Sequence, residues 1–341
     1  MPEDIKLITG VGMRRGPAIA CIGGGTGLST LLRGLKMITT DITAIVTVSD
    51  DGGGSGVLRD ELGMPPPGDI RNCMQALSNA EPTIEKLLAY RFDSGRLKGQ
   101  SFGNLFLAAI NGISESFDKA VIKMGEVLSI TGRVLPVTNE DVYLWAELED
   151  GSMVVGESTI AAAKAKRHSR IRRVTLAPGY ARALPECVKA IENADLIILG
   201  PGSLYTSIIP NLLISGITDA IICSDAVKLY VCNVMTEPGE TDGYSVSDHV
   251  RELFSHTGGK LVDYCLVNSE PAPPGVLEKY SQGGAEPVCE DEDAVRELEV
   301  ELIKAPVATD IGDLARHDPD KLAREILRIF IEKAPTRTYG G

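Results

Sequence analysis

Short apolar runs alternate along this chain with segments in which apolar residues recur at helical spacing. Clustered apolar residues predict buried strands at residues 18–22, 42–48, 196–199, 220–223, 229–234, 261–267 and 299–303. Helical spacing predicts helices at residues 28–35, 69–78, 84–90, 103–111 and 118–128. Strands that alternate with helices are typical of a parallel sheet, so the pattern predicts an α/β fold.

The middle of the chain departs from this pattern. Residues 142–148 alternate apolar and polar side chains, Asp150-Gly151 is a hairpin turn signal, and residues 153–155 return as a short strand. We therefore predict that residues 133–176 form a small antiparallel extension of the sheet. A basic tract at residues 164–173 lies within it, but no aromatic residues are interleaved there, which favours a solvated face over a nucleic-acid surface.

The last predicted element is a helix after Asp318. This aspartate can cap it, Pro319 suits its first turn, and apolar residues at positions 322, 326, 327 and 330 form a stripe. The chain shows no internal repeat and no low-complexity linker. We therefore predict one α/β domain over residues 17–334, with flexible tails at residues 1–16 and 335–341.

Composition narrows the classes of function. The chain has 341 residues, 43% of them hydrophobic, which is enough for a sizeable core and excludes whole-chain disorder. With 34 Lys and Arg against 47 Asp and Glu, its net charge is −13. This charge argues against binding a long polyanion, and so against nucleic acid as a partner, but not against one diphosphate held locally by backbone N–H groups.

Cysteine usage and hydropathy indicate the compartment. The 7 cysteines are scattered and form no C-x-x-C pair, and the histidines show no metal-ligand spacing with them. Free buried thiols fit a reducing cytosol. The first 16 residues lack the apolar core of a signal peptide, and no stretch reaches the length of a membrane span. We therefore expect a cytoplasmic protein without a membrane span.

A first glycine turn joins a predicted strand to a predicted helix. Residues 23–29 read GGGTGLS, and such a turn exposes backbone N–H groups that suit a phosphate. The dinucleotide fingerprint fails because its sixth position is Leu28, and the lysine of a P-loop is missing. This argues against an NAD-dependent oxidoreductase with Asp50 on the ribose. A phosphate loop of another type and a tight packing turn both stay open.

Acidic residues follow two other strand ends. Residues 49–56 read SDDGGGSG, and the adjacent Asp50 and Asp51 can bind a hydroxylated sugar, a base or magnesium. Asp69 opens a further predicted helix, either as its N-cap or facing the same crevice. In doubly wound sheets the loops at the carboxyl ends of strands meet at one ligand-binding crevice.

Two later loops complete the set. Residues 200–208 read GPGSLYTSI and offer hydroxyl donors at positions 203, 206 and 207. Asn233 ends another strand and offers both a donor and an acceptor, as base recognition requires. No G-x-S-x-G nucleophile motif occurs, and no cysteine has an evident activating histidine.

In combination, residues 23–28, 49–56, 67–71, 200–207 and 233–244 resemble the gluconeogenesis-factor (YvcK-like) branch of the CofD-like, 2-phospho-L-lactate transferase superfamily. The resemblance runs from about Ala18 to the final helix. It implies a Rossmann-like three-layer α/β/α fold with a mostly parallel sheet. It also implies a bacterial cytosolic protein that binds UDP-sugars, notably UDP-N-acetylglucosamine, and serves cell shape and cell-wall synthesis during gluconeogenic growth.

The resemblance also implies roles for single residues. Tyr280 and Arg316 match residues that bind the UDP-sugar in that branch. In the transferase branch, carboxylates that match Asp50 and Asp69 bind magnesium and assist transfer to a deazaflavin acceptor. After the first glycine turn the chain continues Leu28-Ser29-Thr30, where that branch favours Thr-Pro-Lys.

Two hypotheses follow. In the first, the protein is a UDP-sugar-binding regulator that requires no cofactor. In the second, it is a magnesium-dependent 2-phospho-L-lactate transferase-like enzyme, with Asp50 and Asp69 as metal ligands and catalytic groups. For the regulator, the backbone of residues 24–27 and 202–203 holds the diphosphate, Asp50 and Asp51 hold hydroxyls, and Asn233 and Thr236 lie near the nucleoside. The expected partners, besides the UDP-sugar, are a second copy of the chain and cell-wall synthesis proteins. The predicted ligand-binding residues are Gly24, Gly25, Thr26, Gly27, Asp50, Asp51, Gly202, Ser203, Tyr205, Ser207, Asn233, Thr236, Thr241, Asp242, Tyr280 and Arg316.

Overall fold

A seven-stranded sheet forms the centre of the protein in a computed structural model that describes residues 16–160, 169–311 and 314–334. The strand order is β10-β9-β8-β7-β1-β2-β3, and every neighbouring pair is parallel. The strands are β1 (Ile19–Gly23), β2 (Ile42–Val46), β3 (Arg133–Pro136), β7 (Leu196–Leu199), β8 (Val227–Val231), β9 (Tyr264–Asn268) and β10 (Glu301–Ala305). Strands β1, β2 and β7 are buried along their whole length, which explains their near-continuous apolar sequences.

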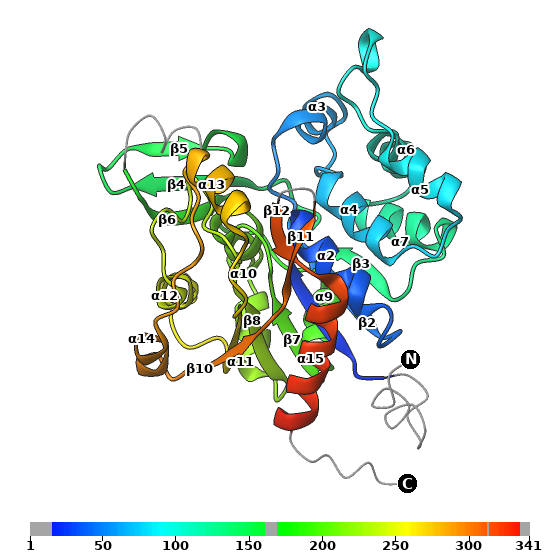
Figure 1. The fold of residues 1–341 in the computed structure, drawn as a ribbon. Helices are drawn as coiled ribbons and strands as arrows, with labels where there is room; N and C mark the ends of the chain where they lie inside the picture. The colour runs from blue at the N-terminus through cyan, green and yellow to red at the C-terminus, as the bar shows by residue number, and fades with distance from the viewer. Residues whose placement is uncertain (1–15, 161–168, 312–313, 335–341) are drawn as a thin grey trace, which may run out of the picture.

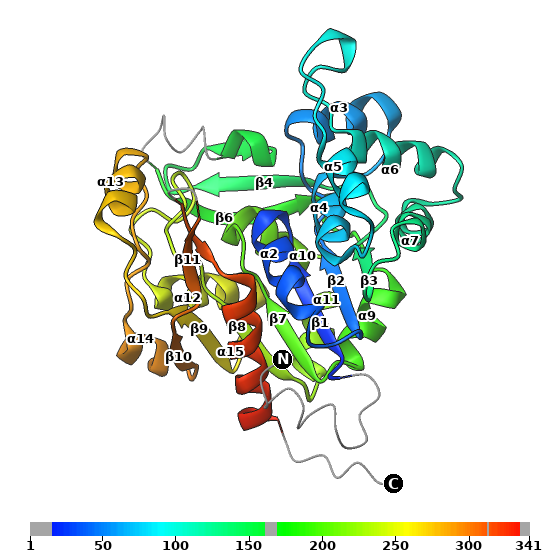
Figure 2. The same cartoon turned by 45° about the vertical axis from the view of Figure 1, so that its right-hand side comes forward.

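Helices cover both faces of this sheet (Figures 1 and 2), which confirms the predicted three-layer α/β/α fold. On one face, α2 (Gly25–Leu35) packs against α4 (Gly68–Leu77) and α15 (Pro319–Lys333), and α9 (Pro185–Glu192) packs against α11 (Ile217–Cys223) elsewhere. The other helices are α3 (Gly53–Leu62), α5 (Pro82–Ala89), α6 (Phe102–Gly112), α7 (Phe117–Val127), α10 (Ile209–Leu212), α12 (Val246–Thr257), α13 (Pro274–Gln282) and α14 (Glu292–Glu297). Within the described part of the chain, no helix combines the length and the apolar character needed to cross a membrane.

The small antiparallel insertion is also confirmed. Strands β4 (Tyr143–Leu148), β5 (Met153–Val155) and β6 (Ile171–Ala177) form a separate sheet in the order β5-β4-β6. The predicted start of this extension at Arg133 is wrong, because β3 pairs with β2 in the parallel sheet. Residues 164–168 of the basic tract and the predicted tails at 1–15 and 335–341 lie outside the described residues.

The strand predicted at residues 220–223 is wrong as well, because these residues belong to helix α11. In this helix Ile217, Ala220 and Ile221 are buried, while Ile222 is 47% exposed. Their spacing of three and four residues is that of a helix face, whereas a buried strand would have covered all four positions. Four consecutive apolar residues are too few to distinguish the period of a helix from that of a strand.

The C-terminal segment was predicted only in part. Asp318 caps α15 as expected, since its carboxylate accepts hydrogen bonds from the N–H groups of Asp320 and Lys321. Just before it, β11 (Ala308–Ile311) and β12 (Leu314–His317) form an antiparallel pair that the sequence pattern did not predict. Helix α15 packs closely on α2, because a Cβ on Gly34 would clash with the carbonyl oxygen of Pro319. This contact fixes the start of α15, which directly follows β12, against the last turn of α2.

The strand order defines where a ligand site is expected. Strand β1 lies between β2, the next strand in the chain, and β7, which returns after the insertion. The chain therefore extends the sheet in opposite directions from β1 and β7. In open α/β sheets the crevice outside such a switch point is the usual ligand-binding position.

Candidate functional site

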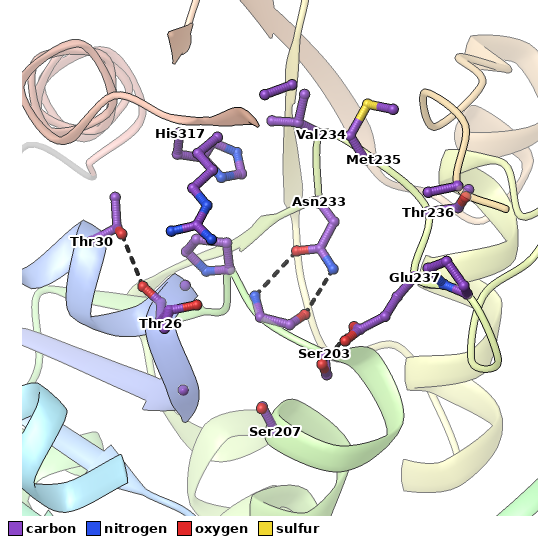
Figure 3. Close-up of a pocket in the computed structure, with 18 of the residues that line it drawn as sticks. Thr26, Thr30, Ser203, Ser207, Asn233, Val234, Met235, Thr236, Glu237 and His317 are labelled. Carbon is purple, nitrogen blue, oxygen red and sulfur yellow. Dashed lines mark hydrogen bonds between the residues drawn. The ribbon is translucent and has the colours of Figure 1, made fainter. Parts of the chain in front are cut away.

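A cavity of about 760 Å³ lies at this switch point. It is lined by the loops that follow β1, β7 and β8, by α13 and by β12 (Figure 3). Its volume falls within the range of about 300–1,000 Å³ typical of small-molecule sites. The lining residues named in the sequence prediction are Gly24, Gly25, Thr26, Gly27, Asp69, Gly202, Ser203, Ser207, Asn233, Thr236, Tyr280 and Arg316.

The two glycine loops of the cavity touch each other. A Cβ on Gly27 would lie 2.5 Å from the carbonyl oxygen of Pro201, a backbone atom that cannot rotate away. Gly27 is therefore required by close packing between the loops after β1 and β7. The same packing places the first turn of α2, whose N–H groups have no partner within the helix, on the cavity wall.

Asp69 lies on the cavity wall at the start of α2. It stands in the first turn of α4, but the N-cap is Pro67, so the N-cap role considered for Asp69 is wrong. The N–H of Gly25 donates a hydrogen bond to its carboxylate. Burial, and then the nearby Asp50 carboxylate, raise the pKa of Asp69 to about 6, against the opposing effects of Gly25 and Arg71.

Glu157 is a cavity residue that the sequence analysis missed. It begins the helical residues 157–160 of the insertion, to which no role had been assigned, so only the fold could bring it here. Its Oε2 atom is buried and has no hydrogen-bond partner among the described residues. Burial, followed by repulsion from Asp69 and Asp50, raises the pKa of Glu157 well above its usual range. We call Asp69 and Glu157 the acidic pair.

Asp50 and Asp51 do not line the cavity, although both lie nearby. Asp50 accepts a hydrogen bond of 2.8 Å from the N–H of Gly52, and burial is the main cause of its raised pKa. Asp51 accepts one of 2.8 Å from the N–H of Ser158. Asp51 thus ties the antiparallel insertion to the second glycine loop.

Asn233 holds a loop in place. Its side-chain NH₂ donates to the carbonyl oxygen of Gly202 at 2.9 Å, and its Oδ1 accepts from the N–H of Gly202 at 3.2 Å (Figure 3). These two bonds fix a glycine whose φ is +153°, a conformation that other residues rarely adopt. This mutual clamp engages the Gly202 N–H and part of the Asn233 amide, while both residues line the cavity.

Besides Asp50 and Asp51, three more predicted ligand residues do not line the cavity. Tyr205 is fully buried, and its hydroxyl lies 2.7 Å from that of Tyr244. Thr241 is also buried, and its Oγ1 accepts from the N–H of Glu237. Asp242 accepts from the N–H of Gly239. Their hydroxyl and carboxylate groups shape the loops behind the cavity.

The loop after β8 provides one cavity wall. Val234 and Met235 give it an apolar surface, while Thr236 pairs with Glu286 through its N–H and its Oγ1. Glu237 was missed by the sequence analysis, although it directly follows the predicted Thr236. Its Oε2 accepts a hydrogen bond of 2.5 Å from the hydroxyl of Ser203 (Figure 3). Burial raises the pKa of Glu237, and the bond from Ser203 opposes this shift.

Two cationic side chains, Lys279 on α13 and Arg316 on β12, line the opposite part of the cavity, and we call them the basic pair. Both are exposed. The hydroxyl of Tyr280 donates to the carbonyl oxygen of Ala315 at 3.2 Å, which joins the two elements that carry them. His317 beside them is buried and its pKa is lowered to about 4, so its ring is neutral at pH 7.

The cavity could hold a metal ion only with help from a ligand. Among the described residues, no group of three or more His, Cys, Asp or Glu side chains is close enough to hold one. The acidic pair supplies two carboxylates, and magnesium is commonly bound by one or two carboxylates together with phosphate oxygens and water. Asp69 fits such a site, whereas Asp50 is outside the cavity lining.

Known proteins resemble this chain along most of its length. The sequence model of the family described as 2-phospho-L-lactate transferase CofD matches residues 19–308. The gluconeogenesis factor of Bacillus subtilis is 50% identical over 321 residues, which cover 94% of this chain and 100% of that protein. A relative from Thermoanaerobacterium thermosulfurigenes is 55% identical over 317 residues, covering 93% of this chain and 98% of its own length. A crystal structure of a Bacillus halodurans protein matches with a TM-score of 0.89 at 47% identity, covering 92% of this chain and 100% of that one.

Proposed function

The chain belongs to the gluconeogenesis-factor branch of the CofD family, and we propose that it binds a UDP-sugar, UDP-N-acetylglucosamine first among them. In this proposal it is a regulatory protein of the cytoplasm that supports cell shape and cell-wall synthesis during growth on gluconeogenic carbon sources. The observation that carries the proposal is the cavity at the switch point, whose lining includes both the first turn of α2 and Arg316.

A diphosphate suits the part of the cavity between α2 and the basic pair. The N–H groups of Thr26 and Gly27 lie in the first turn of α2, where the helix dipole favours an anion. Arg316 and Lys279 add positive charge from the other side. Burial raises the pKa of Glu157, which favours its uncharged form and so reduces the negative charge that a phosphate would meet.

The nucleoside and the sugar need a mixed surface, and the wall after β8 provides one. Val234 and Met235 offer apolar contact to a base or a sugar ring, and Tyr280 adds an aromatic ring from α13. Hydroxyl groups of the ligand can reach Ser203 and Thr26. A small uncharged or purely apolar ligand would make no use of the positive charge of Arg316 or of the N–H groups in the first turn of α2.

Calorimetric titration of the folded full-length chain with UDP-N-acetylglucosamine tests the proposal. We expect saturable binding, competition by UDP, and no competition by N-acetylglucosamine alone, since the diphosphate carries the charge. Absence of heat at millimolar ligand, with folding verified by circular dichroism, would reject the proposed function.

A second candidate, a magnesium-dependent transferase that moves a phosphorylated small acid to a deazaflavin acceptor, has one observation in its favour. Asp69 is a cavity carboxylate at the position where the resemblance implies a magnesium ligand. When bound, magnesium would neutralise the charge of the transferred phosphoryl group. Asp69 would hold the ion together with the ligand, while Asp50 would act at most indirectly.

Turnover discriminates between the two candidates. A phospholactate donor and a deazaflavin acceptor are incubated with magnesium and either the natural chain or its Asp69→Asn variant. Turnover that is lost in the variant would establish the transferase. Turnover that the variant retains would remove Asp69 as the metal ligand, and no turnover with intact UDP-sugar binding would leave the regulator.

A further inference from the structure

One carboxylate in the cavity, that of Glu237, has no role so far. Glu237 and Ser203 stand on different loops, after β8 and after β7, and both line the cavity. The Ser203 hydroxyl donates its proton to Oε2 of Glu237 at 2.5 Å. Neither phosphate binding nor the Asn233 clamp uses these two side chains.

Glu237 is held rigidly before any ligand arrives. Its N–H donates to Oγ1 of Thr241 at 2.8 Å, and its carbonyl oxygen accepts from the N–H groups of Glu240 and Thr241. The preceding Thr236 is fixed to Glu286 by two further hydrogen bonds. A carboxylate that is held in this way loses little conformational entropy when it binds a ligand.

The remaining acceptor capacity of this pair points into the cavity. Among the described residues, no donor contacts Oε1 of Glu237, and this atom is absent from the buried atoms that lack a partner. It is therefore accessible, and its residue lines the cavity. Because the Ser203 proton is directed to Oε2, the lone pairs of the Ser203 oxygen are also left to accept.

Two adjacent acceptors require two adjacent donors from the ligand. A phosphate has only acceptors at neutral pH and would be repelled by the carboxylate. Uracil does not match either, because its single N3–H donor is flanked by two carbonyl acceptors, and these would face the acceptor atoms of the pair. A vicinal diol matches, because each hydroxyl can donate one hydrogen bond, as ribose hydroxyls do to an acidic residue in dinucleotide-binding folds.

We infer that Glu237, with Ser203 beside it, selects ligands that carry a vicinal diol and is the hydroxyl-binding group of the cavity. This inference rests on the proposed function and deepens it, because it names the residues that distinguish one nucleotide from another. It also transfers to Glu237 the hydroxyl-binding role that the sequence assigned to Asp50 and Asp51. The diol is either that of the ribose or that of the hexose.

Titrations with three ligands distinguish these sources. UDP, 2′-deoxy-UDP and UDP-N-acetylglucosamine are titrated into the full-length natural chain, Glu237→Gln and Ser203→Ala. If the ribose supplies the diol, the natural chain binds UDP about tenfold or more tightly than 2′-deoxy-UDP, because 2′-deoxy-UDP lacks one of the two hydroxyls and therefore one hydrogen bond to the charged site. If the hexose supplies it, the natural chain prefers UDP-N-acetylglucosamine to UDP by a similar factor.

Whichever of these two ligand preferences the natural chain shows, it should fall to about threefold or less in Glu237→Gln. In Ser203→Ala the preference should lie between that of Glu237→Gln and that of the natural chain. Glu278→Gln, which changes an exposed glutamate of α13 outside the cavity lining, serves as the matched control and should keep the full preference. Thermal unfolding verifies that each variant folds.

A natural chain without either preference, or a Glu237→Gln variant that keeps the preference, would overturn the inference while leaving UDP-sugar binding in place. A natural chain that binds none of the three ligands would overturn the proposed function, and the inference with it.

Discussion

The acidic pair and the basic pair face the same cavity, yet the protein holds them in opposite ways. Asp69 and Glu157 are largely buried in the cavity wall. Burial raises the pKa of both, with a further contribution from Asp50 to Asp69 and from Asp69 to Glu157. Lys279 and Arg316 are exposed on α13 and β12, where water solvates them. Keeping a buried carboxylate charged costs free energy, whereas keeping an exposed cation charged costs little.

Because of this difference, we expect substitutions in the two pairs to affect different properties of the protein. A substitution in the acidic pair should change the stability of the fold, because it removes a charge that the folded state holds unfavourably. A substitution in the basic pair should change ligand affinity and leave stability nearly unchanged. Perturbed pKa values cluster at functional sites, so the raised pKa values of the acidic pair are consistent with a ligand site in this cavity.

The largest expected effect is on stability in Asp69→Asn. Because folding raises the pKa of this carboxyl to about 6, its proton stabilises the folded state at low pH, and this contribution is lost as the pH rises through about 6. At pH 8 the ionised Asp69 then destabilises the fold by up to about 3 kcal/mol. The variant, whose amide oxygen can still accept from Gly25, should therefore be more stable than the natural chain at pH 8.

Urea unfolding at pH 8 and pH 4 measures this effect. The difference between the variant and the natural chain should shrink to less than about 1 kcal/mol at pH 4, where the natural carboxyl is protonated. Asp60→Asn, at an exposed position of α3, is the control and should change little at either pH. A variant that is less stable at pH 8 would show that the Asp69 charge is compensated in the folded protein.

A smaller effect is expected for Arg316→Ala, and on affinity alone. Loss of a charge-assisted contact to the diphosphate should weaken UDP-N-acetylglucosamine binding about 100-fold, or about 2.7 kcal/mol. The unfolding transition should not move, because Arg316 is exposed. Arg324→Ala, an exposed arginine on α15, should bind the ligand like the natural chain. Unchanged affinity of Arg316→Ala would remove the basic pair from the proposed site.

The same contrast explains what the sequence could predict. A glycine-rich loop directly after an apolar strand is visible in the local sequence. The cavity lining at residues 24–27 and 202–203 could therefore be predicted from the sequence pattern. Glu157 gives no such signal, because only the folding of the insertion brings it to the first glycine loop. The hairpin at β11 and β12 was missed, but Arg316 was still found through the resemblance to a known family.

The errors at single residues have a common physical cause. Thr241 and Asp242 have suitable chemistry near the right strand end, but they lie outside the cavity lining and their side chains hydrogen-bond to the chain itself. A sequence pattern shows which side chains have the chemistry to bind a ligand. It does not show which of these side chains are already hydrogen-bonded to backbone N–H and C=O groups of the folded chain. The strand predicted at residues 220–223 failed for a similar reason, since a short apolar run does not reveal its period.

A crystal structure of the full-length chain with UDP-N-acetylglucosamine tests the central claim most directly. The account predicts a diphosphate between the first turn of α2 and Arg316, with a diol of the ligand on Glu237 and Ser203. A nucleotide sugar bound outside the cavity at the switch point, or an empty cavity at saturating ligand, would contradict it.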